Sequence, residues 1–289
     1  MKKADTKHCC GWLGAHVFLG LSFTLLGCSG AGTSDAGMDA FDAMADAGDG
    51  DSREATDDGW ADGADEFDGD YNPWADRDPD PRCLDLLELH DQQLRDELLA
   101  IVDGHDALSY DGARSELFSF INNIDGEVQC VYTGQWVVTD EVPDPNTMNT
   151  EHTWCQSWGA DTLPAKSDLN HLFPTLSYVN SVRSNYPFGE VYEVTWSEGG
   201  SLKGRDGWGA TVFEPRDPHK GNCARAMFYF AVRYEMNISE RQEEVLKGWN
   251  RFDPPDETER QRNDRVEQVQ LKRNPFIDCP ELVDQIEDF

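Results

Sequence analysis

The sequence predicts an α+β domain over residues 83–289, and the order of its segments carries the prediction. Two helical patterns come first, then β-rich stretches, then a short helix, and finally three longer helical segments. The chain has no repeated strand–helix–strand unit and no glycine-rich phosphate loop, which argues against a parallel sheet that binds nucleotides through such a loop. A chain of this length is large enough to bury a core of its own, and we expect a single domain.

The helices are predicted from apolar residues at helical spacing. A first helix spans CLDLLELHDQQLRDELLAIVDG and stops at Gly104, and a second, DGARSELFSFINN, opens at Asp111. In HLFPTLSYVNSVRSN the spacing predicts a helix from Pro174 to Arg183, with proline in its first turn. The three later helices are expected in KGNCARAMFYFAVRYEM, SERQEEVLKGWNRF and PDETERQRNDRVEQVQLKR.

The strands are predicted from alternating, β-rich stretches. EVQCVYTG and QWVVTD flank a glycine turn, and TEHTW forms a short strand that ends near His152. EVYEVTW and GATVFEP are expected to be strands as well.

The N-terminal segment has the pattern of a signal peptide. A basic start precedes the apolar run WLGAHVFLGLSFTLLG, which is too short and wrongly flanked for a membrane span. The ending Leu-Leu-Gly-Cys resembles a bacterial lipobox, so residues 1–27 would be removed and Cys28 would carry a lipid. Ordinary signal cleavage a few residues later is the alternative. Either outcome predicts export, with an outer-membrane or cell-surface lipoprotein in the first case and a periplasmic or extracellular protein in the second.

Residues 28–82 are expected to be a disordered acidic tether. Residues 31–80 alone contain 17 Asp or Glu against two Arg, a net charge of −15. Such a segment buries too little apolar surface to offset the entropy of ordering it. Its stretch DGADEFDGD alternates carboxylates as calcium loops do but lacks the spacing of an EF-hand. A calcium-organised adhesion protein is the rival interpretation of this tract.

Five cysteines fall in the domain, and none forms a C-x-x-C pair, so a zinc site is not expected. Behind a signal peptide they are able to form one or two disulfides. Cys83 and Cys279 lie at opposite ends of the domain and would make a natural clamp, although the sequence does not determine the pairing. Because the count is odd, at least one thiol stays free.

The candidate active site is the adjacent pair Glu151 and His152. Carboxylate oxygen is a hard ligand that suits Mg²⁺, whereas imidazole titrates near neutrality and suits a general base. This chemistry makes Glu151 a metal ligand and His152 the group that activates water, with a further oxygen donor such as Asn180 completing the site. On residues alone, a polar strand end is the commoner explanation of a Glu-His dipeptide, and a helical Asn is more often a solvated or capping residue.

Other catalytic patterns are missing from this region. The sequence lacks the H-E-x-x-H of metalloproteases and the G-x-S-x-G of serine hydrolases. Cys155 lies three residues after His152, but such proximity in sequence does not establish a thiol nucleophile, and a buried or disulfide-bonded cysteine is the simpler interpretation.

Several blocks in the correct order resemble the bacterial endonuclease I family, over essentially all of residues 83–289. They are NTEHTWCQSWG, KSDLNHLFPTLSYVNSVRSNYPFGEV, FEPRDPHKGNCARAMFYFAVRY and RQRNDRVEQVQLKRNPFIDCPEL. The resemblance implies a ββα-metal (His-Me finger) core, in which a β-hairpin and a helix hold one divalent ion. It also implies cleavage of DNA, and often RNA, with little sequence preference.

Carried over residue by residue, the resemblance assigns metal binding to Glu151 and Asn180 and the general base to His152. Arg183 would either contact phosphate as part of the catalytic site or form a buried structural pair. Orienting roles behind the site fall to Asp168, His171 and Asn185. The metal would be Mg²⁺, with Ca²⁺ and Mn²⁺ as alternatives, and the products would carry 5′-phosphate and 3′-hydroxyl ends.

Two positions depart from the family pattern. Cys155 stands where many members have proline, which puts the turn behind the base in doubt, and Asn170 replaces a frequent histidine. Neither departure touches Glu151, His152 or Asn180, so activity is expected to survive. A catalytically inactive nuclease fold that serves as a surface binding module is the alternative function.

The net charge is unusual for a nucleic-acid binder. The whole chain carries −32, and residues 81–289 hold 38 acidic against 19 basic side chains, a net of −19. Non-specific affinity comes from phosphate neutralisation, so binding should be weak, dependent on the divalent ion and easily suppressed by salt. The basic residues that fall around the site in sequence are Lys166, Arg183, Lys203, Arg205, Arg216 and Lys220.

Overall fold

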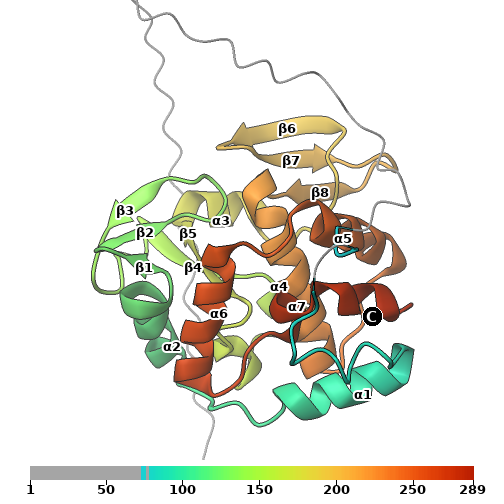
Figure 1. Cartoon of the computed structure of the whole chain (residues 1–289). Helices are drawn as coiled ribbons and strands as arrows, with labels where there is room; N and C mark the ends of the chain where they lie inside the picture. The colour runs from blue at the N-terminus through green and yellow to red at the C-terminus, as the bar shows by residue number, and fades with distance from the viewer. Residues whose placement is uncertain (1–72, 76–77) are drawn as a thin grey trace, which may run out of the picture. The chain divides into compact units, whose positions relative to one another are not determined.

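The computed structural model describes residues 73–75 and 78–289, which belong to one compact unit, Ala64–Phe289 (Figure 1). The predicted signal segment 1–27, Cys28 and the predicted tether up to residue 72 lie outside the described residues. No helix in the described part of the chain has the length and apolar character needed to cross a membrane.

Three small antiparallel sheets form the β part of the domain, which confirms the α+β class. The first joins β1 (Asn123–Ile124), β2 (Glu127–Gln129) and β3 (Trp136–Val138). The second pairs β4 (Met148–His152) with β5 (Leu172–Leu176). The third joins β6 (Glu193–Glu198), β7 (Ser201–Arg205) and β8 (Thr211–Glu214).

The helices lie before, between and after these sheets. They are α1 (Asp91–Val102), α2 (Tyr110–Glu116) with a π-helical turn (Leu117–Ile121), α3 (Ser177–Arg183), α4 (Lys220–Arg233), α5 (Glu240–Phe252), α6 (Glu257–Gln270) and α7 (Pro275–Asp278). Short 3₁₀ turns occur at Gln156–Trp158, Ala165–Ser167, Asp217–His219 and Pro280–Gln285.

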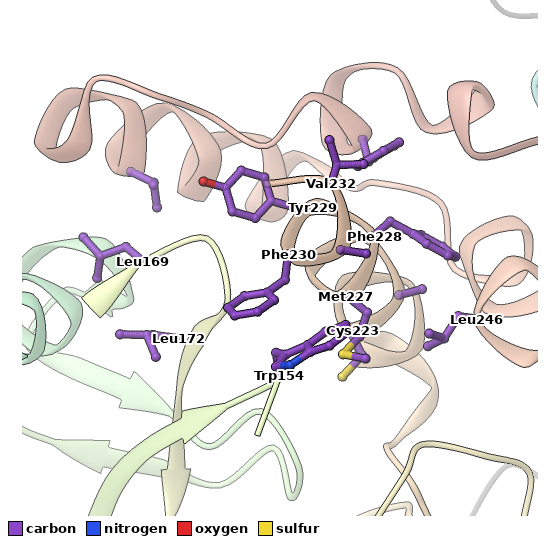
Figure 2. Close-up of a cluster of buried hydrophobic side chains, with 14 of the residues drawn as sticks. Trp154, Leu169, Leu172, Cys223, Met227, Phe228, Tyr229, Phe230, Val232 and Leu246 are labelled. Carbon is purple, nitrogen blue, oxygen red and sulfur yellow. The ribbon is translucent and has the colours of Figure 1, made fainter. Parts of the chain in front are cut away.

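Helix α4 is the centre of the core, because its side chains are buried around most of its circumference. Such a helix is buried by neighbours on all sides rather than on one face. Figure 2 shows Phe230 of α4 beside Trp154, which follows β4, and the two rings stack with centroids 4.9 Å apart. Leu172 of β5 belongs to the same cluster. The β4–β5 hairpin therefore rests on the best-buried helix of the domain.

The prediction of a helix from Pro174 is wrong, because Pro174 lies within strand β5 opposite Thr150. The helix α3 begins three residues later, at Ser177. Proline is tolerated here because each strand of a two-stranded sheet has one edge that needs no backbone donor. The Pro174 carbonyl accepts a hydrogen bond from the Val131 amide, which ties β5 to the segment after β2.

Two other parts of the chain differ from the sequence analysis: the start of the first helix and a strand that was not predicted. The first helix begins at Asp91 rather than at residue 83, and residues 82–88 form turns instead. These turns place the Cys83 sulfur at Cys279 and bury Leu86, contacts that helical spacing alone does not reveal. Strand β7 was missed because SLKGR lacks the apolar alternation of a half-buried strand, and it is held instead between β6 and β8.

The structure contains the disulfide Cys83–Cys279, the pair suggested by its position at the two ends of the domain. The remaining domain cysteines, Cys130, Cys155 and Cys223, are free and buried. One disulfide among the five domain cysteines leaves three free thiols, which agrees with the expectation of at least one.

Removing this disulfide should destabilise the domain. The bond closes a loop with a sequence separation of 196 residues, and a native disulfide of this kind contributes about 2–4 kcal/mol, largely by restricting the unfolded chain. We expect Cys83→Ala/Cys279→Ala to lower the free energy of unfolding by that amount in urea titrations. Dithiothreitol should destabilise the wild type and leave the double variant unchanged, and equal sensitivity of both proteins would contradict the prediction.

Candidate active site

The candidate site is built on a hairpin followed directly by a helix. Strand β4 pairs antiparallel with β5, with Glu151 opposite Phe173 and His152 opposite Leu172. The chain passes from the last residue of β5, Leu176, straight into α3 at Ser177. This order of two strands and one helix agrees with the ββα arrangement that the family resemblance implies.

His152 ends β4 as a buried, neutral imidazole. Its Nε2 lies 3.1 Å from the Lys166 carbonyl oxygen, which only accepts, so the proton resides on Nε2. Nδ1 therefore carries the lone pair and accepts a 3.3 Å hydrogen bond from the Gln156 side chain. Burial lowers the pKa of His152 to about 3. A histidine held in this tautomer presents Nδ1 as its basic atom.

The segment between β4 and β5 holds His152 from one side. The Ala165 carbonyl accepts a 2.8 Å hydrogen bond from Nε2 of His171, and the His171 ring lies 5.5 Å from that of His152. The Tyr110 ring of α2 lies 5.6 Å from the His152 ring, and the Lys166 ammonium lies over the Tyr110 ring. The imidazole is thus fixed by two neighbouring rings and by one carbonyl.

Glu151 points into the protein, toward Tyr132 and Arg183. Its Oε1 accepts a 2.9 Å hydrogen bond from the Tyr132 hydroxyl and lies 2.9 Å from Nε of Arg183. Burial raises the pKa of Glu151, while the Arg183 charge and the Tyr132 hydrogen bond act in the opposite direction. Both described partners meet one oxygen, which leaves Oε2 as the atom available to a ligand.

Arg183 is fully buried at the end of α3. Besides its ion pair with Glu151, it donates 3.0 Å from Nη2 to the Thr153 carbonyl and 2.6 Å from Nη1 to the Cys155 sulfur. This placement corresponds to the buried structural pair, the second of the two roles inferred for Arg183. Cys155, one of the departures from the family pattern, serves here as an acceptor for the guanidinium.

Asn180 projects from α3 onto β4. Its amide nitrogen donates to Asn149 Oδ1 at 2.7 Å and to the Thr150 carbonyl at 3.3 Å, one residue before Glu151. These bonds fix the orientation of the carboxamide and leave its oxygen without a hydrogen bond from the described residues. Asn180 is half-buried, so this oxygen is also accessible.

The donor set of Glu151 and Asn180 fits a small hard cation. Among the residues that the structure describes, no group of three or more His, Cys, Asp or Glu is arranged to hold a metal ion. Glu151 and Asn180 instead offer one carboxylate and one amide oxygen. Mg²⁺ commonly takes only one or two protein oxygens of this kind and keeps several waters. The chemistry of the pair therefore suits Mg²⁺ better than zinc.

Asp168 anchors the segment that carries the carbonyl partners of the two histidines. Its buried carboxylate accepts 2.9 Å hydrogen bonds from Tyr229 and Tyr234, at the C-terminal half and end of α4. It also accepts from the amide and side chain of Asn170. Asp168 and His171 thus both support the surroundings of His152, whereas Asn185 is exposed and contacts Ser157 at 3.3 Å.

Three residues of this arrangement were not predicted from the sequence: Tyr132, Gln156 and Asn149. Tyr132 lies in a stretch assigned to a strand and had no signal of a polar role. Gln156 follows His152 by four residues, a separation that gives no information on geometry in a loop. Asn149 stands two residues before Glu151 on the same face of the strand, which is the one signal that was available.

The buried histidines predict a loss of stability in acid. Burial lowers the pKa of His171 to about 4 and that of His219 to about 3. The unfolded chain binds a proton at each near pH 6.5, whereas the folded chain does not. Stability therefore falls as pH drops from about 6.5 toward about 4, by up to ~1.4 kcal/mol per pH unit for each histidine.

We expect His171→Gln to reduce this pH dependence by about one proton, or ~1.4 kcal/mol per pH unit. The measurement is urea unfolding of wild type and variant at several values between about pH 6.5 and about pH 4.5, within that window. Equal slopes for the two proteins would contradict the assignment.

Comparison with known proteins identifies a family for this chain. The Endonuclease I family matches residues 89–281. The extracellular ribonuclease of Bacillus subtilis (strain 168) is 32% identical over 220 residues, which cover 67% of this chain and 73% of the relative. The periplasmic deoxyribonuclease of Aeromonas hydrophila is 30% identical over 118 residues, or 39% of this chain and 48% of the relative. The match of the family to most of the domain, which includes β4, β5 and α3, shows that this chain belongs to the Endonuclease I family.

Proposed function

We propose that this protein is an exported endonuclease that hydrolyses phosphodiester bonds of DNA and RNA with little sequence preference. The family supports a nuclease, and the names of the relatives include both a ribonuclease and deoxyribonucleases. Those names also describe extracellular and periplasmic proteins, which supports export. Attachment to a membrane through a lipid on Cys28 is a further proposal, based on the sequence alone.

One observation carries the catalytic part of the proposal: the hydrogen bond that fixes His152 Nε2 on the Lys166 carbonyl. It leaves Nδ1 with the lone pair of a neutral imidazole, on the strand that also bears Glu151. A general base needs a neutral ring with a lone pair in a fixed orientation, and the Gln156 amide that now donates to Nδ1 would give way to the attacking water. His171 is held in the same tautomer by the Ala165 carbonyl, but it is fully buried, whereas His152 lies at the end of the strand that bears Glu151.

In the proposed reaction, His152 Nδ1 takes a proton from a water molecule, which attacks phosphorus in line with the departing 3′ oxygen. The Gln156 side chain, now bonded to Nδ1, is positioned to orient that water. Glu151 and Asn180 would hold the divalent ion. When bound, Mg²⁺ would stabilise the charge that develops on the phosphate and on the departing oxygen. The departing 3′ oxygen takes a proton from solvent water, so the products would carry 5′-phosphate and 3′-hydroxyl ends.

Arg183 contributes in this proposal by holding Glu151 rather than by touching the substrate. With one carboxylate oxygen fixed by the guanidinium and by Tyr132, the other is oriented before a ligand arrives. A partner that orients a metal ligand in this way typically contributes roughly 10- to 100-fold in metal affinity or activity.

The test is the nicking of supercoiled plasmid, and the hydrolysis of RNA, by the full chain with Mg²⁺ and with EDTA. We expect His152→Ala to reduce the rate about 10²- to 10⁴-fold, the usual contribution of a general base. His90→Ala, which removes an exposed imidazole outside the site, is the matched control and should keep wild-type activity.

The variant Asn180→Ala separates metal binding from proton transfer. It should raise the Mg²⁺ concentration required for half-maximal activity, whereas His152→Ala should leave that requirement unchanged in any residual activity. If the folded wild type cleaves neither DNA nor RNA in the presence of Mg²⁺, the proposed nuclease activity is overturned and the inactive binding module is supported. Full activity of His152→Ala would overturn the role of the base.

A further inference from the structure

A pocket of about 220 Å³ lies beside β5, apart from His152 and Asn180. It is formed by the β1–β2–β3 sheet, the turn Asp217–His219 and the N-terminal part of α6, which Figure 1 shows next to that sheet. Phe173 lines it, and Phe173 is the cross-strand partner of Glu151. The side chains that matter are those of Arg216, Arg262, Arg265, His219, Trp136 and Phe173.

The three arginines of this pocket make no ion pair with a carboxylate among the described residues. Arg262 is only 7% exposed, yet it donates to neutral acceptors, the Asn122 side chain and the Leu169 and Leu172 carbonyls. Arg265 also bonds to backbone carbonyls alone. A buried charge is normally paired, because desolvation is costly without a counter-charge. Three unpaired arginines are unexpected in a domain with twice as many acidic as basic residues.

The carboxylates at the pocket do not compensate for this charge. Glu259 is engaged by Arg225, through both of its oxygens. Asp256 caps α6, with Oδ1 accepting from the Glu259 amide at 2.7 Å. With Glu259 neutralised, the pocket lining holds three arginines against one remaining carboxylate, Asp256, and the pocket keeps a positive excess.

His219 gives an independent sign of a ligand. It is 3% exposed, lines the pocket, and its Nε2 has no hydrogen-bond partner among the described residues. Burial and the neighbouring Arg262 and Arg216 lower its pKa to about 3, so the ring is neutral. A buried polar atom without a partner is costly unless a ligand or water bonds to it. Beside arginines, a ligand with several acceptor oxygens fits this atom in the tautomer that carries the proton on Nε2.

Trp136 of β3 lies at the pocket and is 47% exposed. A half-exposed indole beside cationic groups offers a face on which a base stacks, as in sites for single-stranded nucleic acid. Arg216 reaches the same pocket across Gly134, where a Cβ atom would lie 2.1 Å from Nη1. The pocket thus combines arginines for phosphate with an aromatic surface for a base.

We propose that this pocket binds a backbone phosphate of a nucleic-acid strand, with the neighbouring base stacked on Trp136. The inference rests on the proposed function, because the bound strand would be a substrate of the site on β4. The pocket adjoins β5, the partner of that strand, and so extends the substrate contact beyond the cleavage site.

The test measures binding without cleavage. Fluorescence anisotropy of a labelled single-stranded 12-nucleotide DNA is followed at several salt concentrations with the full chain in EDTA and, because the divalent ion is expected to strengthen binding, with the His152→Ala chain in Mg²⁺. We expect Arg216→Gln and Arg265→Gln each to weaken binding about 5- to 20-fold and to reduce the salt dependence by about one phosphate contact. Trp136→Thr should weaken binding about tenfold without changing the salt dependence.

Arg251→Gln is the matched control, because it removes the same charge from α5, where Arg251 pairs with Asp284 at 2.5 Å. It should bind within about twofold of wild type, since surface charges away from a contact contribute little. Melting temperatures of all variants show whether each is folded. Unchanged affinity in folded Arg216→Gln and Arg265→Gln would overturn the proposal, and so would absence of binding both by wild type in EDTA and by His152→Ala in Mg²⁺.

Two sources of phosphate are separated in the same assay. A mononucleotide or inorganic phosphate should displace the labelled strand only at far higher concentration than an unlabelled 12-nucleotide strand does. Equal potency, lost in the arginine variants, would show a site for free nucleotide and overturn the assignment to a strand. If the wild type cleaves neither DNA nor RNA but binds the strand through these arginines, the proposed function is overturned and the proposed strand-binding pocket stands. If the wild type cleaves nucleic acid and the arginine variants bind as tightly as it does, only the pocket proposal is overturned.

Discussion

The candidate site depends on one buried ion pair, between Arg183 and Glu151. The guanidinium also bonds to the Thr153 carbonyl and to the Cys155 sulfur, so a single side chain joins α3, β4 and the segment after β4. Removing one partner of such a pair costs about 3–5 kcal/mol, against a total stability of roughly 5–15 kcal/mol for a typical domain. The pair is therefore a constraint on folding as well as on the site. It also explains why a carboxylate is tolerated in the core: one oxygen is neutralised, and the other is left oriented for a ligand.

The second support is the attachment of the segment between β4 and β5 to α4. Asp168 accepts from Tyr229 and Tyr234, so a buried carboxylate is stabilised by two hydroxyls rather than by a cation. The stacking of Trp154 on Phe230 fixes the start of the same segment. Because the Lys166 carbonyl that orients His152 lies within it, the tautomer of the proposed base is set by the packing of α4. Helix α4 thus acts on the chemistry through backbone position, although it supplies no group to the site.

The sequence predicted the local parts of this arrangement and missed the long-range ones. The α+β class, β4 and the position of Glu151 and His152 at its end follow from short-range patterns. Pro174 was misassigned because Leu176, Val179 and Val182 recur at helical spacing and proline is common in the first turn of a helix. Only the pairing with Thr150 shows that Pro174 belongs to a strand. Tyr132 is 19 residues from Glu151, and Tyr229 is 61 residues from Asp168, so no local pattern announces either contact. Arg183 must be exposed to contact phosphate and buried to form a structural pair. Which of the two holds depends on the packed fold and cannot be read from a local sequence pattern.

The acidic composition and the proposed substrate are compatible because net charge and local charge act at different distances. Salt screens exposed charges beyond about 8–10 Å, so the distant carboxylates of this domain do not cancel a cluster of arginines in a pocket. What matters locally is whether each cation is already neutralised. Lys220 is paired with Glu214 and Asp217, and Arg225 with Glu259, so these contribute little to attraction. Arg216, Arg262 and Arg265 have no such carboxylate partner among the described residues. Repulsion from the whole domain would then slow the approach of a polyanion, while the unpaired arginines would hold a strand that has arrived.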